Sequence, residues 1–183
     1  MPEPQYALVA YIRNSLGKWV EDLRRELHPP HGHLPAHITV LPPRCLSGTE
    51  AEAREQVEQA CQSVVPFSVV LGDVEHFLPV TPTVFIRVAR AGYRLRELHD
   101  RLNTGTLASA EQWPYMPHLT IVKVDTLEEA KAAAKIAAQR WAEFPGPHAA
   151  QIEELTFVRQ VPGSDRWQDL APFPLGPRLA STR

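Results

Sequence analysis

Residues 36–43 read Ala36-His37-Ile38-Thr39-Val40-Leu41-Pro42-Pro43, and residues 117–123 read Pro117-His118-Leu119-Thr120-Ile121-Val122-Lys123. Both segments place a His-x-Thr pattern ahead of a short apolar run. Successive side chains of a β-strand point to opposite faces, so the histidine and threonine of each segment share one face and the residue between them lies on the other. The sequence therefore predicts two strands that are each half core and half polar site.

The two segments occupy equivalent places in a repeated order of strand, helix, strand, helix and strand. The motif histidines are 81 positions apart, and the strands that open the two halves are about 77 positions apart. Alternating or helical spacing of apolar residues predicts each element. The predicted strands cover residues 6–13, 37–41, 67–77, 84–88, 118–124 and 152–161, with an edge at 167–175, and the predicted helices cover 16–28, 49–64, 91–103 and 126–142.

This order predicts a two-lobed α+β fold of the mixed α/β kind. Duplicated β-α-β-α-β units are expected to form two mainly antiparallel sheets that face a central cleft, with the helices on the outside. Residues 1–183 are expected to form a single domain, with lobe one at about 5–78, lobe two at about 82–162 and a C-terminal tail at 163–183. An approximate two-fold axis would bring the two polar strand faces together across the cleft.

Two histidines and two threonines that face one cleft suit the opening of a cyclic phosphodiester. A neutral imidazole takes a proton from water while a protonated one gives a proton to the departing ribose oxygen, and histidine titrates close enough to neutral pH to supply both forms. Threonine hydroxyls donate to the non-bridging phosphate oxygens. We predict His37, Thr39, His118 and Thr120 as catalytic residues, with His118 as the base and His37 as the acid, although near-symmetry permits the reverse.

The two motifs resemble the paired signatures of the 2H phosphoesterase superfamily, in the branch that contains 2′-5′ RNA ligases and cyclic phosphodiesterases. The similarity extends to Phe67–Phe77, to Glu97-Leu98-His99 and to Leu155-Thr156-Phe157-Val158-Arg159. It implies a bilobal α/β fold and metal-independent hydrolysis of 2′,3′-cyclic or related phosphodiesters of nucleotides or RNA ends. Some members of this family also join RNA ends through a 2′-5′ bond without ATP, so the resemblance includes such ligation among the expected activities.

Five further residues are candidates for substrate binding: Tyr11, Arg13, Arg87, Tyr115 and Lys123. Tyr11 and Arg13 share a face of the first strand, and Arg87 belongs to its counterpart in the second half. An arginine is frequent in the family five positions after the second motif histidine, and Lys123 keeps the charge there without the bidentate fork. This substitution weakens the case for ligation of long RNA. Strict alternation also predicts that Lys123 points away from the site, unless the strand twists or ends there.

Composition restricts the partners of the chain. A formal net charge of −2 gives no global basic field for nucleic acid, so a nucleotide or RNA end would have to meet a local patch. The apolar run Ala7–Ile12 is too short for a signal-peptide core or a membrane span, so we expect a cytoplasmic protein with no membrane contact. We also expect a monomer with no obligate protein partner. Cys45 and Cys61 have no metal or redox spacing and are expected to be free thiols.

No cofactor and no metal are expected, but three alternatives stay open. The stretch His28-Pro29-Pro30-His31-Gly32-His33 is a rival zinc site, although its proline- and glycine-broken loop lacks a rigid ligand framework. The same cleft could also belong to a module that binds nucleotides or RNA ends without turning them over. The physiological substrate is also open, since cyclic mononucleotides, RNA termini, ADP-ribose cyclic phosphate and 2′-5′ oligonucleotides all fit the motif residues.

Overall fold

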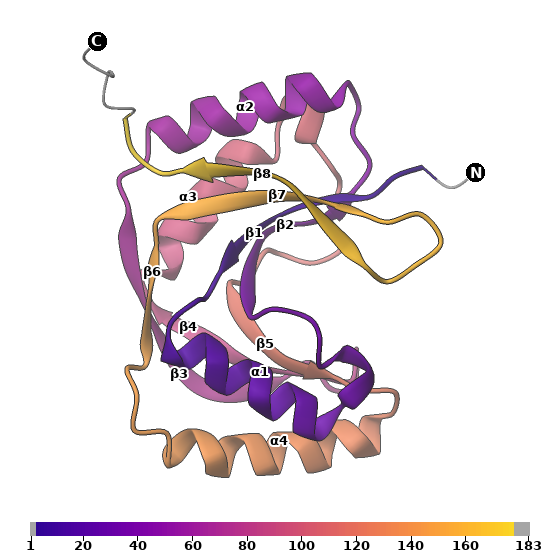
Figure 1. Cartoon of the computed structure of the whole chain (residues 1–183), viewed down its shortest axis with the longest axis vertical. Coiled ribbons are helices and arrows are strands. Elements are labelled where there is room, and N and C mark those ends of the chain that lie inside the picture. Colours follow the sequence, from indigo (N-terminus) through magenta and orange to yellow (C-terminus); the bar gives the residue numbers. More distant parts are fainter. Residues whose placement is uncertain (1–2, 178–183) are drawn as a thin grey trace.

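The computed structural model describes residues 3–177 and shows one curled, antiparallel eight-stranded sheet with the strand order β6-β3-β4-β5-β2-β1-β7-β8. Helices cover the outer faces of the two ends of this sheet, and the concave side opens between them (Figure 1). The predicted α+β class is confirmed. The two expected sheets are joined into one, because β2 and β5 pair at the centre.

Most predicted elements agree with the observed ones to within a few residues. The predicted strand at 152–161 is in fact two strands, β6 and β7, which lie in different parts of the sheet. Residues 178–183 of the predicted tail lie outside the described residues. The strands are β1 (Tyr6–Tyr11), β2 (His37–Arg44), β3 (Phe67–His76), β4 (Thr83–Arg90), β5 (His118–Lys123), β6 (Ala149–Ile152), β7 (Glu154–Gln160) and β8 (Trp167–Pro174), and the α-helices are α1 (Ser15–Leu27), α2 (Glu50–Gln62), α3 (Gly92–Leu102) and α4 (Leu127–Ala142).

The helices that follow the two motif strands begin in the same way. The Thr49 side chain caps α2 and the Thr126 side chain caps α4, and in each case a glutamate three residues later (Glu52 or Glu129) bonds back to the backbone N–H of the cap. These capping boxes satisfy backbone donors that the first turn of a helix leaves free. The duplication predicted from the order of elements is thus repeated in the local chemistry of the helix starts.

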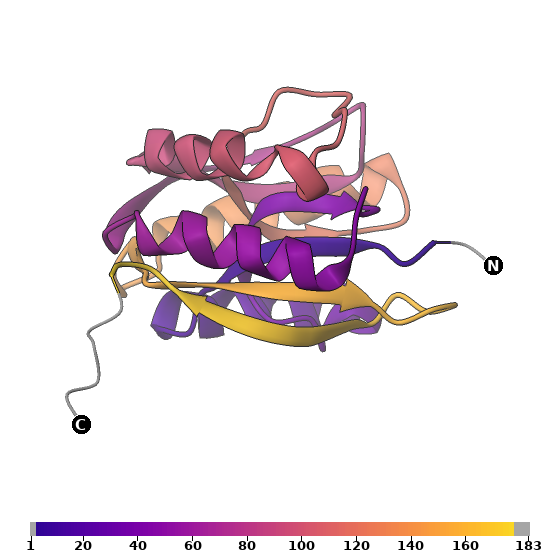
Figure 2. The ribbon, with the colours of Figure 1, turned by 90° about the horizontal axis from the view of Figure 1, so that it is seen from above.

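The two halves of the sheet are not the two halves of the sequence. β2, β1, β7 and β8 form one half, against which α2 and α3 pack, while β5, β4, β3 and β6 form the other, against which α1 and α4 pack. The expected lobes at 5–78 and 82–162 therefore differ from the observed halves. The physical reason is an exchange: α1 packs against β5 of the other half and α3 packs against β2, while the final hairpin returns to β1 (Figures 1 and 2).

Each motif strand contains a bulge directly after its threonine. In the pairing of β1 with β2, Val9 lies opposite Thr39 and the neighbouring Leu8 lies opposite Leu41, so β2 has one extra residue. In the pairing of β4 with β5, Phe85 lies opposite Thr120 and Val84 lies opposite Val122. Because a bulge resets the alternation of side chains, the residues beyond it change face.

The centre of the sheet is held by one pair of strands that soon separate. Ile38 on β2 and Leu119 on β5 are partners and are fully buried at 0% exposure. Just beyond them the Arg24 guanidinium, on α1, donates to the Thr120 oxygen at 2.6 Å and to the Ile121 oxygen at 2.8 Å, and it also bonds the Leu34 oxygen. Arg24 therefore satisfies the β5 carbonyl groups that β2 leaves without a partner.

Removing the Arg24 guanidinium should destabilise the protein. Arg24→Met leaves several buried carbonyl oxygens without a donor, and we expect the free energy of unfolding to fall by about 2 to 4 kcal/mol. Arg25→Met is the matched control, because Arg25 is on the exposed side of α1 in a surface ion pair with Asp22, and it should change the free energy by less than about 1 kcal/mol. Urea denaturation of both variants measures the difference. Equal effects would contradict a stabilising role for the hydrogen bonds of Arg24.

Candidate active site

The four motif side chains lie on one face of the sheet, around the pairing of Ile38 with Leu119. Since those two residues point into the core, the flanking His37, Thr39, His118 and Thr120 point to the concave side, and all four are half-buried. The expectation that the polar faces of the two motif strands come together therefore agrees with the pairing of β2 with β5. Within residues 3–177, neither threonine hydroxyl bonds another protein group, so both can donate to a ligand.

The two imidazoles are held in the same way. Nδ1 of His37 lies 2.8 Å from the Pro35 oxygen, and Nδ1 of His118 lies 2.8 Å from the Met116 oxygen. A carbonyl oxygen can only accept, so Nδ1 of each ring carries a proton and Nε2 is left with a lone pair in the neutral form. Each Nε2 can therefore accept a proton when neutral and give one when protonated.

Burial lowers the pKa of both histidines below the ordinary value. For His118 burial is opposed only by the hydrogen bond to the Met116 oxygen. The pKa of His37 is lowered first by burial, and the positive charges of Arg24 and His118 lower it further against the bond to Pro35. Both imidazoles are therefore neutral at a pH where an exposed histidine is already partly charged.

The surroundings of the two histidines differ. His118 is enclosed by aromatic rings, with its centroid 5.0 Å from that of Phe85 and 5.1 Å from that of Phe77. Among the aromatic rings of residues 3–177, His37 meets only the edge of Tyr11, and the two ring centroids lie 6.3 Å apart. The strand registers show the cause: Val9 lies opposite Thr39 where the other half has Phe85 opposite Thr120. A small side chain thus leaves space beside His37 where a large one fills the space beside His118.

That space is a cavity of about 1160 Å³ that His37 and Thr39 line and His118 and Thr120 do not. Its walls come from β1, β2, the start of α1, the loop before His37 and the β7–β8 hairpin. Tyr11 and Arg13, both expected to bind substrate, line it. The structure also places Arg166 and Trp167 there, which the sequence alone did not single out because they lie in the predicted tail, far along the chain from either motif.

The other expected binding residues lie in different places. Arg87 is opposite His118 in the register and lies 3.6 Å from the Glu75 carboxylate. Lys123 is opposite Thr83, on the face that Thr120 and Phe85 share, so the prediction that it points away is wrong. The bulge after Thr120 is the physical reason, because it shifts the alternation by one residue. Lys123 does not line the cavity.

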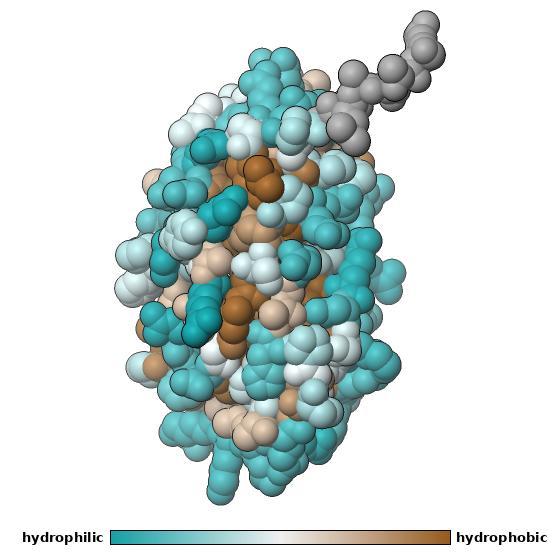
Figure 3. Space-filling model, turned by 90° about the vertical axis from the view of Figure 1, so that its left-hand side faces the viewer, coloured by the Kyte–Doolittle hydropathy of each residue, from teal (hydrophilic) through white to brown (hydrophobic). Residues whose placement is uncertain are grey.

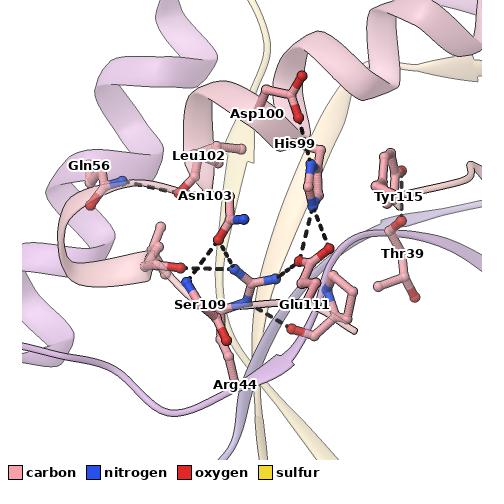
Figure 4. A network of polar contacts seen from close by, with 12 residues as sticks. Thr39, Arg44, Gln56, His99, Asp100, Leu102, Asn103, Ser109, Glu111 and Tyr115 are labelled. Atoms are coloured by element: carbon pink, nitrogen blue, oxygen red, sulfur yellow. Dashed lines mark hydrogen bonds and ion pairs between the residues drawn. The ribbon is translucent and has the colours of Figure 1, made fainter. Parts of the chain in front are cut away.

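Tyr115 is used to hold the site together. Its hydroxyl donates to the Thr39 oxygen at 2.9 Å and its ring stacks on His99 at 4.3 Å. His99 in turn lies 3.0 Å from Glu111, which pairs with the buried guanidinium of Arg44 (Figure 4). This network fixes the loop before His118 against β2. Its members are widely spaced in the sequence, so no local pattern pointed to it.

The described part of the chain offers no group of three or more histidine, cysteine, aspartate or glutamate side chains that could hold a metal ion. The loop at 28–33 brings only His28 and His31 together, with ring centroids 4.7 Å apart, and Nδ1 of His31 faces the Lys123 oxygen at 3.4 Å. Both cysteines are free thiols, as expected. Among residues 3–177 no helix has the length and apolar character needed to cross a bilayer.

Comparison with known families settles the relationship. The profile of the 2′-5′ RNA ligase superfamily matches residues 12–163, which include both motif strands and the helices between them. The chain belongs to the 2′-5′ RNA ligase superfamily. The resemblance to the 2H phosphoesterases found in the sequence is thereby confirmed, and the chain is a member of a family of phosphoesterases and RNA ligases.

Relatives within the superfamily are distant. The chain is 24% identical over 120 residues to "Putative phosphoesterase OB1230" of Oceanobacillus iheyensis, an overlap of 65% of this chain and 70% of that protein. It is also 24% identical over 161 residues to a "Putative phosphoesterase" of Staphylococcus epidermidis, covering 86% and 90% of the two chains.

Solved structures share the fold. The crystal structure of Escherichia coli LigT complexed with phosphate is 17% identical with a TM-score of 0.62, over 96% of this chain and 99% of LigT. The TT0787 protein of Thermus thermophilus is 14% identical with a TM-score of 0.58, over 96% and 100% of the two chains. The bilobal fold is thus common to proteins whose sequences have diverged widely.

The two histidines should titrate as a coupled pair below the ordinary histidine pKa of about 6.5. Replacing His118 with Gln removes a positive charge near His37 and should raise the pKa of His37, and Arg24→Met should do the same. Because the folded state disfavours both imidazolium ions, the free energy of unfolding should fall as the pH drops from about 6.5 through the lowered values. NMR titration of the side-chain nitrogens tests this, and an unchanged His37 pKa in both variants would contradict the coupling.

Proposed function

We propose that this protein is a metal-independent phosphodiesterase that hydrolyses 2′,3′-cyclic phosphate ends of nucleotides or RNA. The observation that carries the proposal is the pair of matched imidazoles on one concave face, each with Nδ1 held by a backbone oxygen. Within the part of the chain that the structure describes, the Nε2 atoms and the two threonine hydroxyls have no protein partner. These groups supply a base, an acid and donors for the phosphate.

The asymmetry of the cavity supports a definite assignment of roles. The departing ribose oxygen stays attached to its nucleoside, and the nucleoside needs space, which lies beside His37. His37 is then the acid: its protonated Nε2 gives a proton to the ribose oxygen as the bond from that oxygen to phosphorus breaks. His118 is the base, and its neutral Nε2 takes a proton from the water whose oxygen attacks phosphorus from the opposite side.

The threonine pair completes the chemistry. The Thr39 and Thr120 hydroxyls flank the two histidines and can donate to the non-bridging oxygens, on which charge builds as water adds. Thr39 is further positioned by the bond from Tyr115 to its own backbone oxygen. A preorganised donor needs no reorientation during the reaction, which is why a rigid β-strand suits this role.

Solved relatives are consistent with a phosphate ligand in this fold. LigT has been crystallised with phosphate and with 3′-AMP, and the second of these structures has a TM-score of 0.58 to this chain. Hydrolysis of a 2′,3′-cyclic phosphate gives either a 2′-phosphate or a 3′-phosphate, depending on which ribose oxygen leaves. 3′-AMP is one of these two products. The same steps with the 5′-hydroxyl of an RNA in place of water would give a 2′-5′ ligase: the 5′-oxygen bonds to phosphorus, the 3′-oxygen leaves and takes a proton, and the phosphate stays on the 2′-oxygen. Lys123 on the site face supplies charge for this reaction.

Loss of either histidine should abolish most turnover. His37→Ala and His118→Ala should each lower kcat/KM for a 2′,3′-cyclic nucleotide by about 100-fold or more, the usual size of an acid or base contribution. The assay contains EDTA, and wild-type turnover should persist. Tight binding without any product would favour the non-catalytic binding module, and loss of wild-type activity in EDTA would favour the zinc alternative.

A substrate with a good leaving group should separate the roles of the two histidines. A p-nitrophenyl phosphodiester loses a phenolate that needs no proton, so His37→Ala should recover much of its activity on this substrate while His118→Ala does not. The ratio of the two kcat/KM values for each variant is the measurement. The opposite pattern would exchange the acid and the base.

A further inference from the structure

The cavity beside His37 is larger than one nucleotide requires. Its volume of about 1160 Å³ exceeds the range of about 300–1000 Å³ typical of pockets for small ligands. From His37 and Thr39 it follows the concave face of β1 and β7 and reaches the start of β8, where Arg166 and Trp167 line it. In Figures 1 and 2 the β7–β8 hairpin projects beyond the body of the protein on this side.

The floor of the cavity is apolar and has an aromatic ring at each end. Ala7, Val9 and Val158 form a small buried cluster, separate from the main core, and Tyr11 and Trp167 pack against it. All five residues line the cavity. Flat aromatic rings beside an apolar floor are how proteins hold unpaired bases of single-stranded nucleic acid, because every base offers a face for stacking.

The Tyr11 and Trp167 rings lie at two successive positions along the cavity. The Tyr11 hydroxyl donates to the Asp169 carboxylate at 2.6 Å, so Asp169 lies next to the ring nearer His37. Trp167 is two residues from Asp169 on the same strand, and residues two apart share a face at a spacing of about 7 Å. Trp167 therefore lies one further step along the cavity from the reacting groups.

Two cations in the cavity have no carboxylate partner among residues 3–177. The Arg13 guanidinium lies over the Tyr11 ring at 5.1 Å and that of Arg166 makes no polar contact with a side chain. Lys18, which also lines the cavity, differs because it pairs with Asp22 at 2.7 Å. Arginines without partners beside aromatic rings favour a phosphodiester group.

Other directions from the site suit a nucleotide less well. The smaller cavity of about 560 Å³, on the other side of Tyr11 and Arg13, is lined by Glu153 and Glu154, against which its lining has one arginine or lysine, Arg13. The larger cavity also has two carboxylates in its lining, Glu21 and Asp169, but they are outnumbered by Arg13, Lys18 and Arg166. The face of the molecule that carries β6 has a broken strip of apolar side chains among polar ones, which is a poorer platform for stacked bases than a continuous apolar floor (Figure 3). A chain that carries negative charge at every step would therefore extend toward the hairpin.

We propose that Arg166 and Trp167 form a subsite for a second nucleotide, so that the preferred substrate is the end of an RNA strand and not a mononucleotide. Arg166 would contact the phosphodiester that joins the last two nucleotides, and Trp167 would stack on the base of the penultimate one. The proposal rests on the proposed function only for the placement of the terminal phosphate between His37 and His118.

Binding of unreactive products tests the subsite directly. We would titrate the full chain with the dinucleotide ApAp and with 3′-AMP by calorimetry, since both end in a phosphate monoester that cannot be opened. One stacked base is worth about 1–3 kcal/mol, so ApAp should bind at least about fivefold more tightly. Equal affinities would overturn the proposal, as would tighter binding of ADP-ribose phosphate without tighter binding of ApAp.

Four variants test which residues cause the preference for ApAp over 3′-AMP. Trp167→Ala should remove most of the preference for ApAp, and Trp167→Phe, which keeps a ring, should retain it. Arg166→Gln should reduce the preference and lower the slope of log affinity for ApAp against log salt by about 0.7, the share of one phosphate in single strands. Arg90→Gln removes the same charge from an exposed position at the end of β4, outside both cavities, and should leave the preference unchanged.

Circular dichroism confirms that each variant is folded. A preference that survives Trp167→Ala, or falls equally in Arg90→Gln, would overturn the subsite. Turnover of cyclic mononucleotides is a separate measurement. An inactive protein that still prefers ApAp would refute the proposed function and keep the subsite, whereas an active protein without the preference would do the reverse.

Discussion

The structure depends on a single junction between the two halves of its sheet, where Ile38 of β2 pairs with Leu119 of β5. Both side chains are fully buried, so the residues on either side of them are forced onto the concave face, and these are the two histidines and two threonines. The strands separate beyond this point because Arg24 takes over the carbonyl groups of β5. The junction thus places all four motif side chains on one face, at the edge of the cavity that His37 and Thr39 line.

Local symmetry at the junction is close. Each motif histidine bonds the backbone oxygen two residues before it, and each motif threonine is followed by a bulge. The symmetry ends one strand away, where Val9 and Phe85 occupy equivalent positions. The two imidazoles are equivalent in their geometry, but packing makes the two sides of the site unequal. Only the side of His37 has space for the rest of a substrate.

The buried polar network behind the site shows how distant segments stabilise it. Arg44, Glu111, His99 and Tyr115 form a continuous series of contacts that ends on the backbone of Thr39 (Figure 4). Buried charged groups are tolerated only when paired and hydrogen-bonded, and here the pairing orders the long loop that leads into His118. The two motifs are thereby connected through this loop as well as through the sheet.

The sequence by itself determined the elements, their duplicated order, the α+β class and the shared face of each His-x-Thr pair, because these follow from local periodicity and spacing. Only the tertiary structure decided how the halves are composed, that the sheet is continuous, that Lys123 lies on the site face and that Trp167 reaches the cavity beside His37. Each of these depends on contacts between residues far apart in the chain, or on a bulge whose position is set by pairing with a neighbouring strand. Side-chain periodicity carries no information on either.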